Sequence, residues 1–362
     1  MRKSAVDVIS TAFAHAADQL AEPFRFGQWA RLALLALATG ELSSGSGCGN
    51  ILRSIPAQFP KPSHSFVDPN FADPKDLFHG IDPALLVTLF LVVLVGGLVL
   101  MLVWIFVGSV SRFMLFEAVL TKHCGPLGAG WQRWQGPGLK YFGWQLILFV
   151  ISISVAAVLF LPLLLPILAT VKNNRDFGPG LFLAFLPMIL VFAAFSLILG
   201  LIHLFSKDFV VPLMALDGIG VFEGWKRVWA MMKTEPLSYA GYVGMKIVLA
   251  IGASVVFGIL SGIAAAIVAV PFVVVGVALA LMAKGGGLSW NAVTITALVV
   301  LGVIALAILA YVVALACVPV AVFFPAYAMY FFAERYPALH ARLYPAPPVP
   351  PAPSTWTPGP AG

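Results

Sequence analysis

The sequence predicts an all-α integral membrane protein, a bundle of about six transmembrane helices with additional interfacial amphipathic helices. Of the 362 residues, 61% are hydrophobic and only 10% are charged, whereas soluble globular domains average roughly 45–50% apolar and about 25% charged residues. Long apolar runs recur along the chain, and a run of about 20 residues suffices to cross the hydrocarbon core of a bilayer. Basic residues stand singly or in small groups between these runs, which argues against a nucleic-acid-binding surface.

Four runs are long enough to be spans without further argument: 83–107, 142–170, 181–205 and 293–317. The run 239–283 is also apolar, but at 1.5 Å per residue it is about twice as long as the bilayer is thick. We therefore expect it to tilt, kink or break, and Pro271 is the most favourable kink site because proline lacks the amide proton. Segment 29–44 is a sixth candidate, although its apolar part is short.

The distribution of basic residues favours counting 29–44 as a span. With six spans, 15 of the 21 Lys and Arg residues fall on one side of the membrane, whereas without 29–44 the division is nearly even. Lys and Arg concentrate in cytoplasmic loops. This count predicts a multi-pass protein of the bacterial inner membrane with both termini in the cytoplasm.

The N-terminal stretch 5–20 has apolar residues at helical spacing and polar residues off that stripe, which predicts an amphipathic helix. Two interpretations remain open. The helix lies on the membrane surface, or it packs on other parts of the same protein.

Two stretches of the chain resemble each other, which predicts a parallel internal repeat. A Ser-Arg pair at Ser111 stands 19 residues before the Gly-Trp-Gln-Arg motif that begins at Gly130, and a Ser-Lys pair at Ser206 stands 18 residues before the Gly-Trp-Lys-Arg motif that begins at Gly224. Aromatic belts and inside-positive charge produce part of this pattern, but the near-constant spacing favours a true repeat.

The repeat units cover about 1–107, 108–205 and 206–335, within one polytopic membrane domain over 1–344. Each unit contains two crossings, so the axis relating the units runs along the membrane normal. The proline-rich segment 345–362 cannot pack as a helix and is predicted to be a disordered tail.

The sequence contains no recognisable catalytic constellation. The six histidines lack paired-ligand spacing, and there is no nucleophile elbow, phosphate loop or dinucleotide fingerprint. We therefore expect no enzymatic activity, no cofactor and no metal. The three cysteines lack Cys-x-x-Cys spacing, and no structural disulfide is expected. The span centres carry no ionisable residue, which disfavours ion-coupled transport.

Charged and aromatic side chains gather near the predicted inner interface. Cations beside aromatic residues at phosphate depth are typical of sites for anionic lipid headgroups, and structural ion pairs between repeats are the simpler alternative. The candidate residues are Arg112, Glu117, Trp131, Lys207, Asp208 and Trp225. Small residues at i, i+4 spacing in the fifth span, Ser254, Gly258 and Gly262, predict a helix-packing face.

Residues 208–214 (DFVVPLM) and 223–227 (EGWKR) resemble a widespread bacterial family of polytopic membrane proteins of unknown function. That family is similar to the membrane domain attached to some glycerophosphoryl diester phosphodiesterases. Residues 111–117 (SRFMLFE) resemble the family's earlier Ser-Arg-Gly-x-Phe motif without its glycine. The resemblance implies six helical spans and no established activity, and no soluble phosphodiesterase domain is found from which an enzymatic function could be carried over.

These observations favour a binding or scaffolding component of a membrane assembly. The expected partners are membrane lipids and either another membrane protein or a second copy of the chain, with no nucleic acid. The alternative is a transporter or lipid-handling protein without a midplane ionisable site, and the third is a membrane-embedded enzyme.

Overall fold

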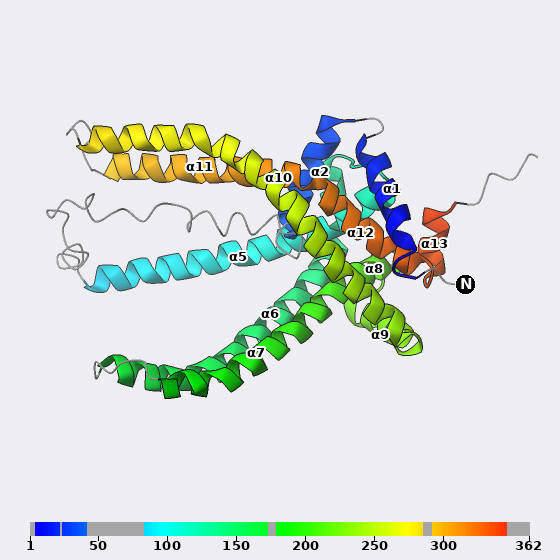
Figure 1. Cartoon of the computed structure of the whole chain (residues 1–362), viewed down its shortest axis with the longest axis horizontal. Helices are drawn as coiled ribbons and strands as arrows, with labels where there is room; N and C mark the ends of the chain where they lie inside the picture. The colour runs from blue at the N-terminus through cyan, green and yellow to red at the C-terminus, as the bar shows by residue number, and fades with distance from the viewer. Residues whose placement is uncertain (1–3, 22–23, 42–82, 173–178, 285–291, 346–362) are drawn as a thin grey trace, which may run out of the picture.

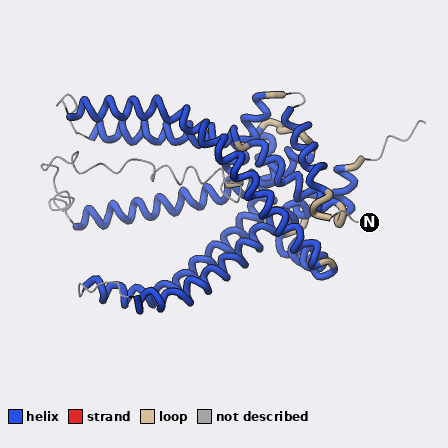
Figure 2. Tube along the Cα trace, in the orientation of Figure 1, coloured by secondary structure: helices blue, strands red, loops and turns tan. Residues whose placement is uncertain are grey.

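A computed structural model describes residues 4–21, 24–41, 83–172, 179–284 and 292–345. All regular structure in these residues is helical (Figure 2), so the predicted all-α class is confirmed. Figure 1 shows a compact part at one end, from which long helices extend as three arms. The arms are formed by one single helix, α5, and by two helix pairs, α6 with α7 and α10 with α11.

Five helices of the described chain are long and apolar enough to cross a membrane, as in a multi-pass membrane protein. They are α5 (Pro83–Leu120), α6 (Leu127–Lys172), α7 (Pro179–Phe205), α10 (Pro236–Lys284) and α11 (Ala292–Ala316). The five apolar runs of the sequence lie within them, except that 293–317 ends one residue beyond α11. α5 and α6 extend well beyond the predicted runs, because their inner ends stay helical inside the compact part, where tertiary packing stabilises them.

α10 is one continuous helix of 49 residues with Pro271 in its interior. At 1.5 Å per residue it is about 74 Å long, which exceeds the bilayer thickness as the sequence indicated. The helix does not end at the proline, and it accommodates its length by changing direction on its way from the compact part into its arm (Figure 1).

The sixth predicted span, 29–44, coincides with α2 (Phe26–Thr39), a helix of 14 residues. Such a helix is about 21 Å long, shorter than the hydrocarbon core, and its side chains at Leu32, Ala33 and Ala36 are buried. α2 is therefore a helix of the compact part, and residues 42–44 lie outside the described residues. It ends at Gly40, whose positive φ of 69° lets its amide donate to the carbonyl of Leu37.

The compact part is completed by short helices: α1 (Val8–Ala21), α8 (Val211–Asp217), α9 (Val221–Thr234), α12 (Val318–Ala333) and α13 (Pro337–Leu343). α1 packs along α12, and its buried face includes Val8, Ala12 and Ala16. Of the two interpretations left open for the N-terminal helix, the structure therefore favours packing on the protein itself. The two ends of the described chain lie together at this end of the molecule (Figure 1).

His15 fastens α1 to its neighbours. Its Nε2 lies 2.8 Å from the carbonyl oxygen of Val119 on α5, and its Nδ1 lies 3.0 Å from the hydroxyl of Tyr330 on α12. A neutral ring satisfies both contacts, with Nε2–H donating to the carbonyl and Nδ1 accepting from the hydroxyl. Burial lowers the pKa of His15, which keeps this neutral form.

The arms bury little of their own surface. No residue is buried in the most apolar 18-residue window of α5 or of α6, and only 11% of the corresponding window of α11 is buried. On the predicted packing face of α10, Gly258 is half-buried, and a Cβ built there would meet no atom within 4 Å. The buried positions on this stretch of α10 are Ser261 and Ala265. The face at Ser254, Gly258 and Gly262 thus stays a prediction for contact outside the described chain.

The expectation that no disulfide forms is wrong for Cys317. This residue, between α11 and α12, is disulfide-bonded, and its partner lies outside the described residues because Cys124, the other described cysteine, is free and buried. Spacing alone missed the bond, because residues far apart in the sequence become neighbours only in the fold.

Candidate functional site

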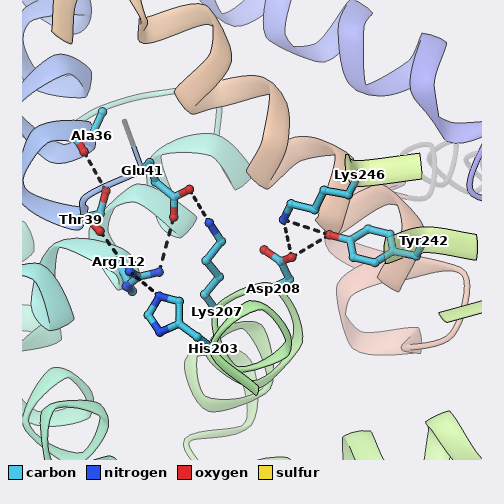
Figure 3. A network of polar contacts seen from close by, with 9 residues as sticks. All are labelled: Ala36, Thr39, Glu41, Arg112, His203, Lys207, Asp208, Tyr242 and Lys246. Carbon is cyan, nitrogen blue, oxygen red and sulfur yellow. Dashed lines mark hydrogen bonds and ion pairs between the residues drawn. The ribbon is translucent and has the colours of Figure 1, made fainter. Parts of the chain in front are cut away.

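A buried cluster of five charged side chains lies where α2, α5, α7 and α10 meet in the compact part (Figure 3). We call it the charge cluster. Its side chains are only 5–11% exposed. The members are Glu41, Arg112, Lys207, Asp208 and Lys246.

Glu41 bridges two cations from different helices. One carboxylate oxygen lies 3.5 Å from Nη1 of Arg112 on α5, and the other accepts from Nζ of Lys207 at 2.5 Å. Arg112 also donates to the carbonyl of Thr39 at 3.0 Å and lies 3.3 Å from Nε2 of His203. Because arginine can only donate, the imidazole nitrogen is the acceptor of that contact.

The neighbouring cations dominate the electrostatics of Glu41. Burial alone would raise the pKa of this carboxyl, but Lys207 and Arg112 together lower it to about 2. Glu41 is therefore ionised at neutral pH and holds the last residues of α2 against α5 and against the turn that follows α7.

Asp208 forms the second half of the cluster. It sits in a single π-helical turn, η2 (Ser206–Val210), between α7 and α8. Its carboxylate accepts from the hydroxyl of Tyr242 at 2.8 Å and from the ammonium group of Lys246, both on α10. The side chains of Lys246 and Tyr242 point toward Asp208 in Figure 3. The ammonium group of Lys246 is buried in this ion pair.

The π turn that contains Asp208 holds one more residue than the corresponding stretch after Ser111. Met114 comes three residues after Ser111, and Val210 comes four after Ser206. These two residues nonetheless hold matching places, since a Cβ on Gly130 would meet Met114 and one on Gly224 would meet Val210. A π turn accommodates one additional residue in a helix and is frequent at functional sites.

The aromatic neighbours of the two motifs match as well. The rings of Phe113 and Tyr141 meet edge-on with centroids 6.0 Å apart, and those of Phe209 and Tyr239 meet edge-on at 5.5 Å. Both phenylalanines come directly after the cluster residues of their segment. The two similar stretches thus make matching contacts, around Arg112 in one and around Lys207 and Asp208 in the other, and the three-unit repeat stays a prediction.

A small cavity of about 40 Å³ opens among the five charged side chains. We call it the central cavity. Its remaining lining is apolar and comes from α5, α8 and α12. A space of this size exceeds what one water molecule needs, which is about 10–15 Å³ on the same measure.

The structure brings three of the predicted candidate residues together and places three apart. Arg112, Lys207 and Asp208 belong to the charge cluster, whereas Glu117 pairs with the exposed Arg133 and accepts from Trp134. Both predicted tryptophans have packing roles: Trp131 meets Phe106 edge-on, and Trp225 donates to the Ser206 hydroxyl at 3.1 Å. Arg112 and Lys207 form ion pairs with Glu41, a carboxylate that is not among the predicted residues.

Sequence reasoning missed Glu41, His203, Tyr242 and Lys246 as members of one site. Two signals were available. Glu41 is an acidic residue directly after the apolar segment 29–39, and Tyr242 and Lys246 stand at i, i+4 spacing on one helix face. Neither signal identifies a partner in the sequence. Tyr242 and Lys246 contact each other on one helix, but every other contact of this cluster joins residues at least 34 positions apart.

A groove between α7, α9 and α10 is the second feature of this region. It measures about 610 Å³ and is lined by apolar side chains that include Leu201, Val243 and Ile247. Lys233 also lines it, with its ammonium group 5.6 Å from the ring centroid of Trp229. A cation and an aromatic ring at the rim of an apolar groove are typical of the membrane interface.

A family model described as "Family of unknown function (DUF7544)" matches residues 3–342. The chain belongs to this family. The match takes in the compact part, the five apolar helices and every residue of the charge cluster. No curated protein and no solved structure matches the chain. Membership in DUF7544 thus places the charge cluster inside a family-wide domain and assigns it no activity.

Proposed function

We propose that this DUF7544 protein is a non-enzymatic, multi-pass membrane protein that acts as a binding and scaffolding component of a membrane assembly. The observation that carries the proposal is the contrast between a well-packed compact part and arms whose apolar side chains are almost entirely uncovered by the chain itself. A transporter encloses a path between its spans, whereas the described portions of these arms pack little against one another.

The compact part supplies rigidity to such a scaffold. Ion pairs of the charge cluster tie the end of α2, α5, η2 and α10 together at the roots of the arms. The arms then present apolar faces, such as the outward side chains of α5 at Val92 and Val95, to helices of a partner membrane protein or a second copy. Van der Waals packing and lipid entropy drive such contacts in a bilayer.

We further propose that the compact part faces the cytoplasm of a bacterium and that the arms cross its inner membrane. Most of the described basic residues lie in the compact part, among them Arg25, Arg31, Lys226 and Arg335, as the positive-inside rule requires of a cytoplasmic face. The disulfide at Cys317 favours the opposite orientation, because disulfides persist in oxidising compartments. A reporter fused at Gly136, on the α6 segment of the compact part, decides between the two.

Photo-crosslinking in intact membranes tests the scaffolding role. A photoreactive amino acid replaces Val92 on the α5 arm, and a matched probe replaces Leu237, which is 87% exposed at the compact end of α10. Scaffolding predicts one discrete protein adduct from the arm probe, of the same mass in independent preparations, and a different pattern from the control probe. Lipid adducts alone at position 92, together with a monomeric mass in mild detergent, would contradict it.

Lipid handling is the second candidate, and the groove between α7, α9 and α10 favours it. The apolar lining suits an acyl chain, and the ammonium group of Lys233 suits an anionic headgroup at the rim. A larger groove of about 720 Å³ lies between α1, α10 and α12, and none of the described residues that line it is charged.

Native mass spectrometry tests whether the protein handles lipid through this groove. The full chain is exposed to phosphatidylglycerol and to phosphatidylcholine, and retained lipid is counted for the parent protein, Lys233→Gln and Lys226→Gln. Lys226 is the matched control because it is exposed on the same helix and does not line the groove. Selective retention of phosphatidylglycerol that falls only in Lys233→Gln supports the groove site. Equal retention in all three proteins excludes it.

We also propose that the chain is related to the membrane domain of glycerophosphoryl diester phosphodiesterases. It is supported by segment 208–214, which contains the π turn and Asp208. A structure of that membrane domain with an equivalent buried carboxylate in a π turn would establish the kinship. A straight α-helix there, without the extra residue, would end it.

A further inference from the structure

The groove between α1, α10 and α12 has no part in the scaffolding role and is separate from the groove at Lys233. We call it the α1 groove. It measures about 720 Å³, and its described lining residues are uncharged. Trp29 is the one described lining residue with a polar side chain, and its indole N–H donates to the carbonyl oxygen of Leu20 at 3.1 Å. The described side chains therefore offer no free hydrogen-bonding group, which suits an apolar ligand.

α1 presents an apolar side to this groove as well as to α12. Val8 and Ala12 are buried on the side that packs along α12. Phe13 and Ala17 line the groove and are exposed, and Ala21 continues their row at i, i+4 spacing. The packing of α1 on the protein thus leaves a second apolar surface of this helix uncovered by the described chain.

α10 forms the opposite wall near the start of its arm. Gly252 and Ala253 line the groove there, and a Cβ on Gly252 would meet no atom within 4 Å. Glycine inside a helix costs stability relative to alanine, and close packing within the described chain does not offset that cost here. The neighbouring Ile251 and Val255 are 61% and 59% exposed. The groove is therefore continuous with the uncovered apolar surface of the α10 arm.

A cation between two aromatic residues stands beside the groove. Phe24 lines it and packs on Trp29 with ring centroids 5.6 Å apart. Arg25 comes next in the chain and is exposed, and no described residue forms an ion pair with it. Phe26 follows and is 64% exposed. Exposed aromatic residues are typical of the membrane interface and cations of contact with anionic headgroups, so this corner between α1 and α2 fits the headgroup layer.

A phospholipid fits these features better than a helix of another protein. Helices in a bilayer associate through close backbone approach at small residues. Phe13 and Phe24, which are 68% and 63% exposed, stand at the mouth of the groove and would hold a helix away. An acyl chain is thinner and can pass between such rings. An unfilled apolar space also forfeits dispersion contacts, and acyl chains are what surrounds the long helices of a multi-pass membrane protein.

We propose that the α1 groove binds an acyl chain of one anionic phospholipid, whose phosphate group is held by Arg25. The lipid joins α1 to the base of the α10 arm and fixes this side of the compact part at the depth of the headgroups. This inference goes beyond the scaffolding role and is independent of it, because the protein adduct expected at Val92 does not require a filled groove.

Lipid photolabelling of the full chain in a neutral detergent tests the site. The probe is phosphatidylglycerol with a photoreactive diazirine near the end of one acyl chain, and the adducts are located by mass spectrometry of peptides. The proposal predicts adducts on segments 13–21 and 248–257, which an excess of unlabelled phosphatidylglycerol removes. Phosphatidylcholine should compete about fivefold less well, since one cation near an anionic headgroup contributes about that factor in affinity.

Two variants address the two parts of the site. Gly252→Leu places a side chain in the groove and should abolish the adducts on α1. Gly276→Leu is the matched control, because a Cβ on Gly276 of the same helix also meets no atom within 4 Å and this residue does not line the groove. Arg25→Gln should lower the labelling of α1 about fivefold. Lys233→Gln, in the other groove, should leave that labelling unchanged.

The parent protein alone can overturn the proposal, even where a variant fails to fold. Adducts confined to the arms, with none on α1, would mean that the groove holds no lipid. Adducts on α1 that survive Gly252→Leu, or that Arg25→Gln leaves unchanged, would also contradict it. A discrete protein adduct from a photoreactive amino acid at Ala17 in intact membranes would assign the groove to a second copy or a partner helix instead.

Discussion

Substituting Glu41 by glutamine tests how strongly the charge cluster holds the roots of the arms. The change removes one negative charge and keeps the shape of the side chain. It leaves Arg112 and Lys207, which are 10–11% exposed, without their shared counter-charge. The expected result is a large loss of stability, because the remaining cations stay buried and repel each other.

The structure sets the magnitude of this loss. Unit charges 3.5 Å apart, the separation of Arg112 and Glu41, attract by roughly 5 kcal/mol at an effective dielectric constant of about 20. The cost of burying the charges opposes this attraction, and removing one partner of a buried pair costs about 3–5 kcal/mol in practice. For a chain of this size, such a loss lowers the unfolding midpoint by on the order of 10 °C.

Thermal unfolding of the detergent-solubilised chain, in gluconate at pH 7, measures the effect. Glu223→Gln is the matched control, since Glu223 pairs with Arg227 at the surface, where the two side chains are 47% and 42% exposed. That pair contributes about 0.3–0.5 kcal/mol. Glu41→Gln with Lys207→Gln should recover part of the loss, because one carboxylate and one cation are removed together. Equal midpoints for the two single glutamate variants would refute the reasoning.

Three further outcomes are expected. Burial lowers the pKa of His15 from about 6.5, so the contribution of His15 to stability is complete above pH 6.5 and is lost as the pH falls below that value. His15→Gln should flatten the profile of unfolding midpoint against pH in that range. An unchanged profile would contradict the neutral ring. The pKa of Glu41 is about 2 against an ordinary 4.5, so a second loss should appear between pH 4.5 and 2 and be absent in Glu41→Gln. A Cβ on Gly138 would lie 2.6 Å from Val110, whereas one on Gly143 would meet nothing within 4 Å. Gly138→Ala should therefore cost about 1–3 kcal/mol of unfolding free energy, and Gly143→Ala should cost none. Equal effects of the two substitutions would be inconsistent with the close packing of α5 on α6.

The sequence was sufficient to predict the fold class and the five longer spans. A run of twenty or more apolar residues without charges has one stable solution in a bilayer, namely a helix, because every backbone polar group must be paired within the segment. The ends of these helices were not predictable in the same way. α5 continues for 13 residues past the predicted end at 107, and that extension is stabilised by buried neighbours such as Val110 and Phe113.

The sixth segment shows a limit of charge counting. The positive-inside rule assigns each loop to one side of the membrane. For 29–44 the count of basic residues placed the two ends of the segment on opposite sides, as in a helix that crosses. It cannot tell a lipid-facing span from a short helix such as α2, whose Leu32 and Ala36 are buried among protein neighbours. Both kinds of helix have the same composition, so only the tertiary contacts distinguish them.

The candidate site was predictable in part. Arg112, Lys207 and Asp208 were predicted because cations beside aromatic residues at phosphate depth are typical of sites for anionic headgroups, and the structure brings them together. Glu41 and Lys246 complete the site from the N-terminal region and from α10. No local pattern links these positions, since they become neighbours only when the helices of the compact part pack together.

The central claim is that a compact end outside the hydrocarbon carries apolar arms through it. Spin labels on single cysteines in reconstituted vesicles measure this directly, with one label at Val92 on the α5 arm, one at Val274 on the α10 arm and one at Phe222 on α9. The arm labels should be accessible to oxygen and shielded from a polar nickel reagent, and the label at Phe222 should be accessible to the nickel reagent. Equal exposure of all three labels to the nickel reagent would contradict the account.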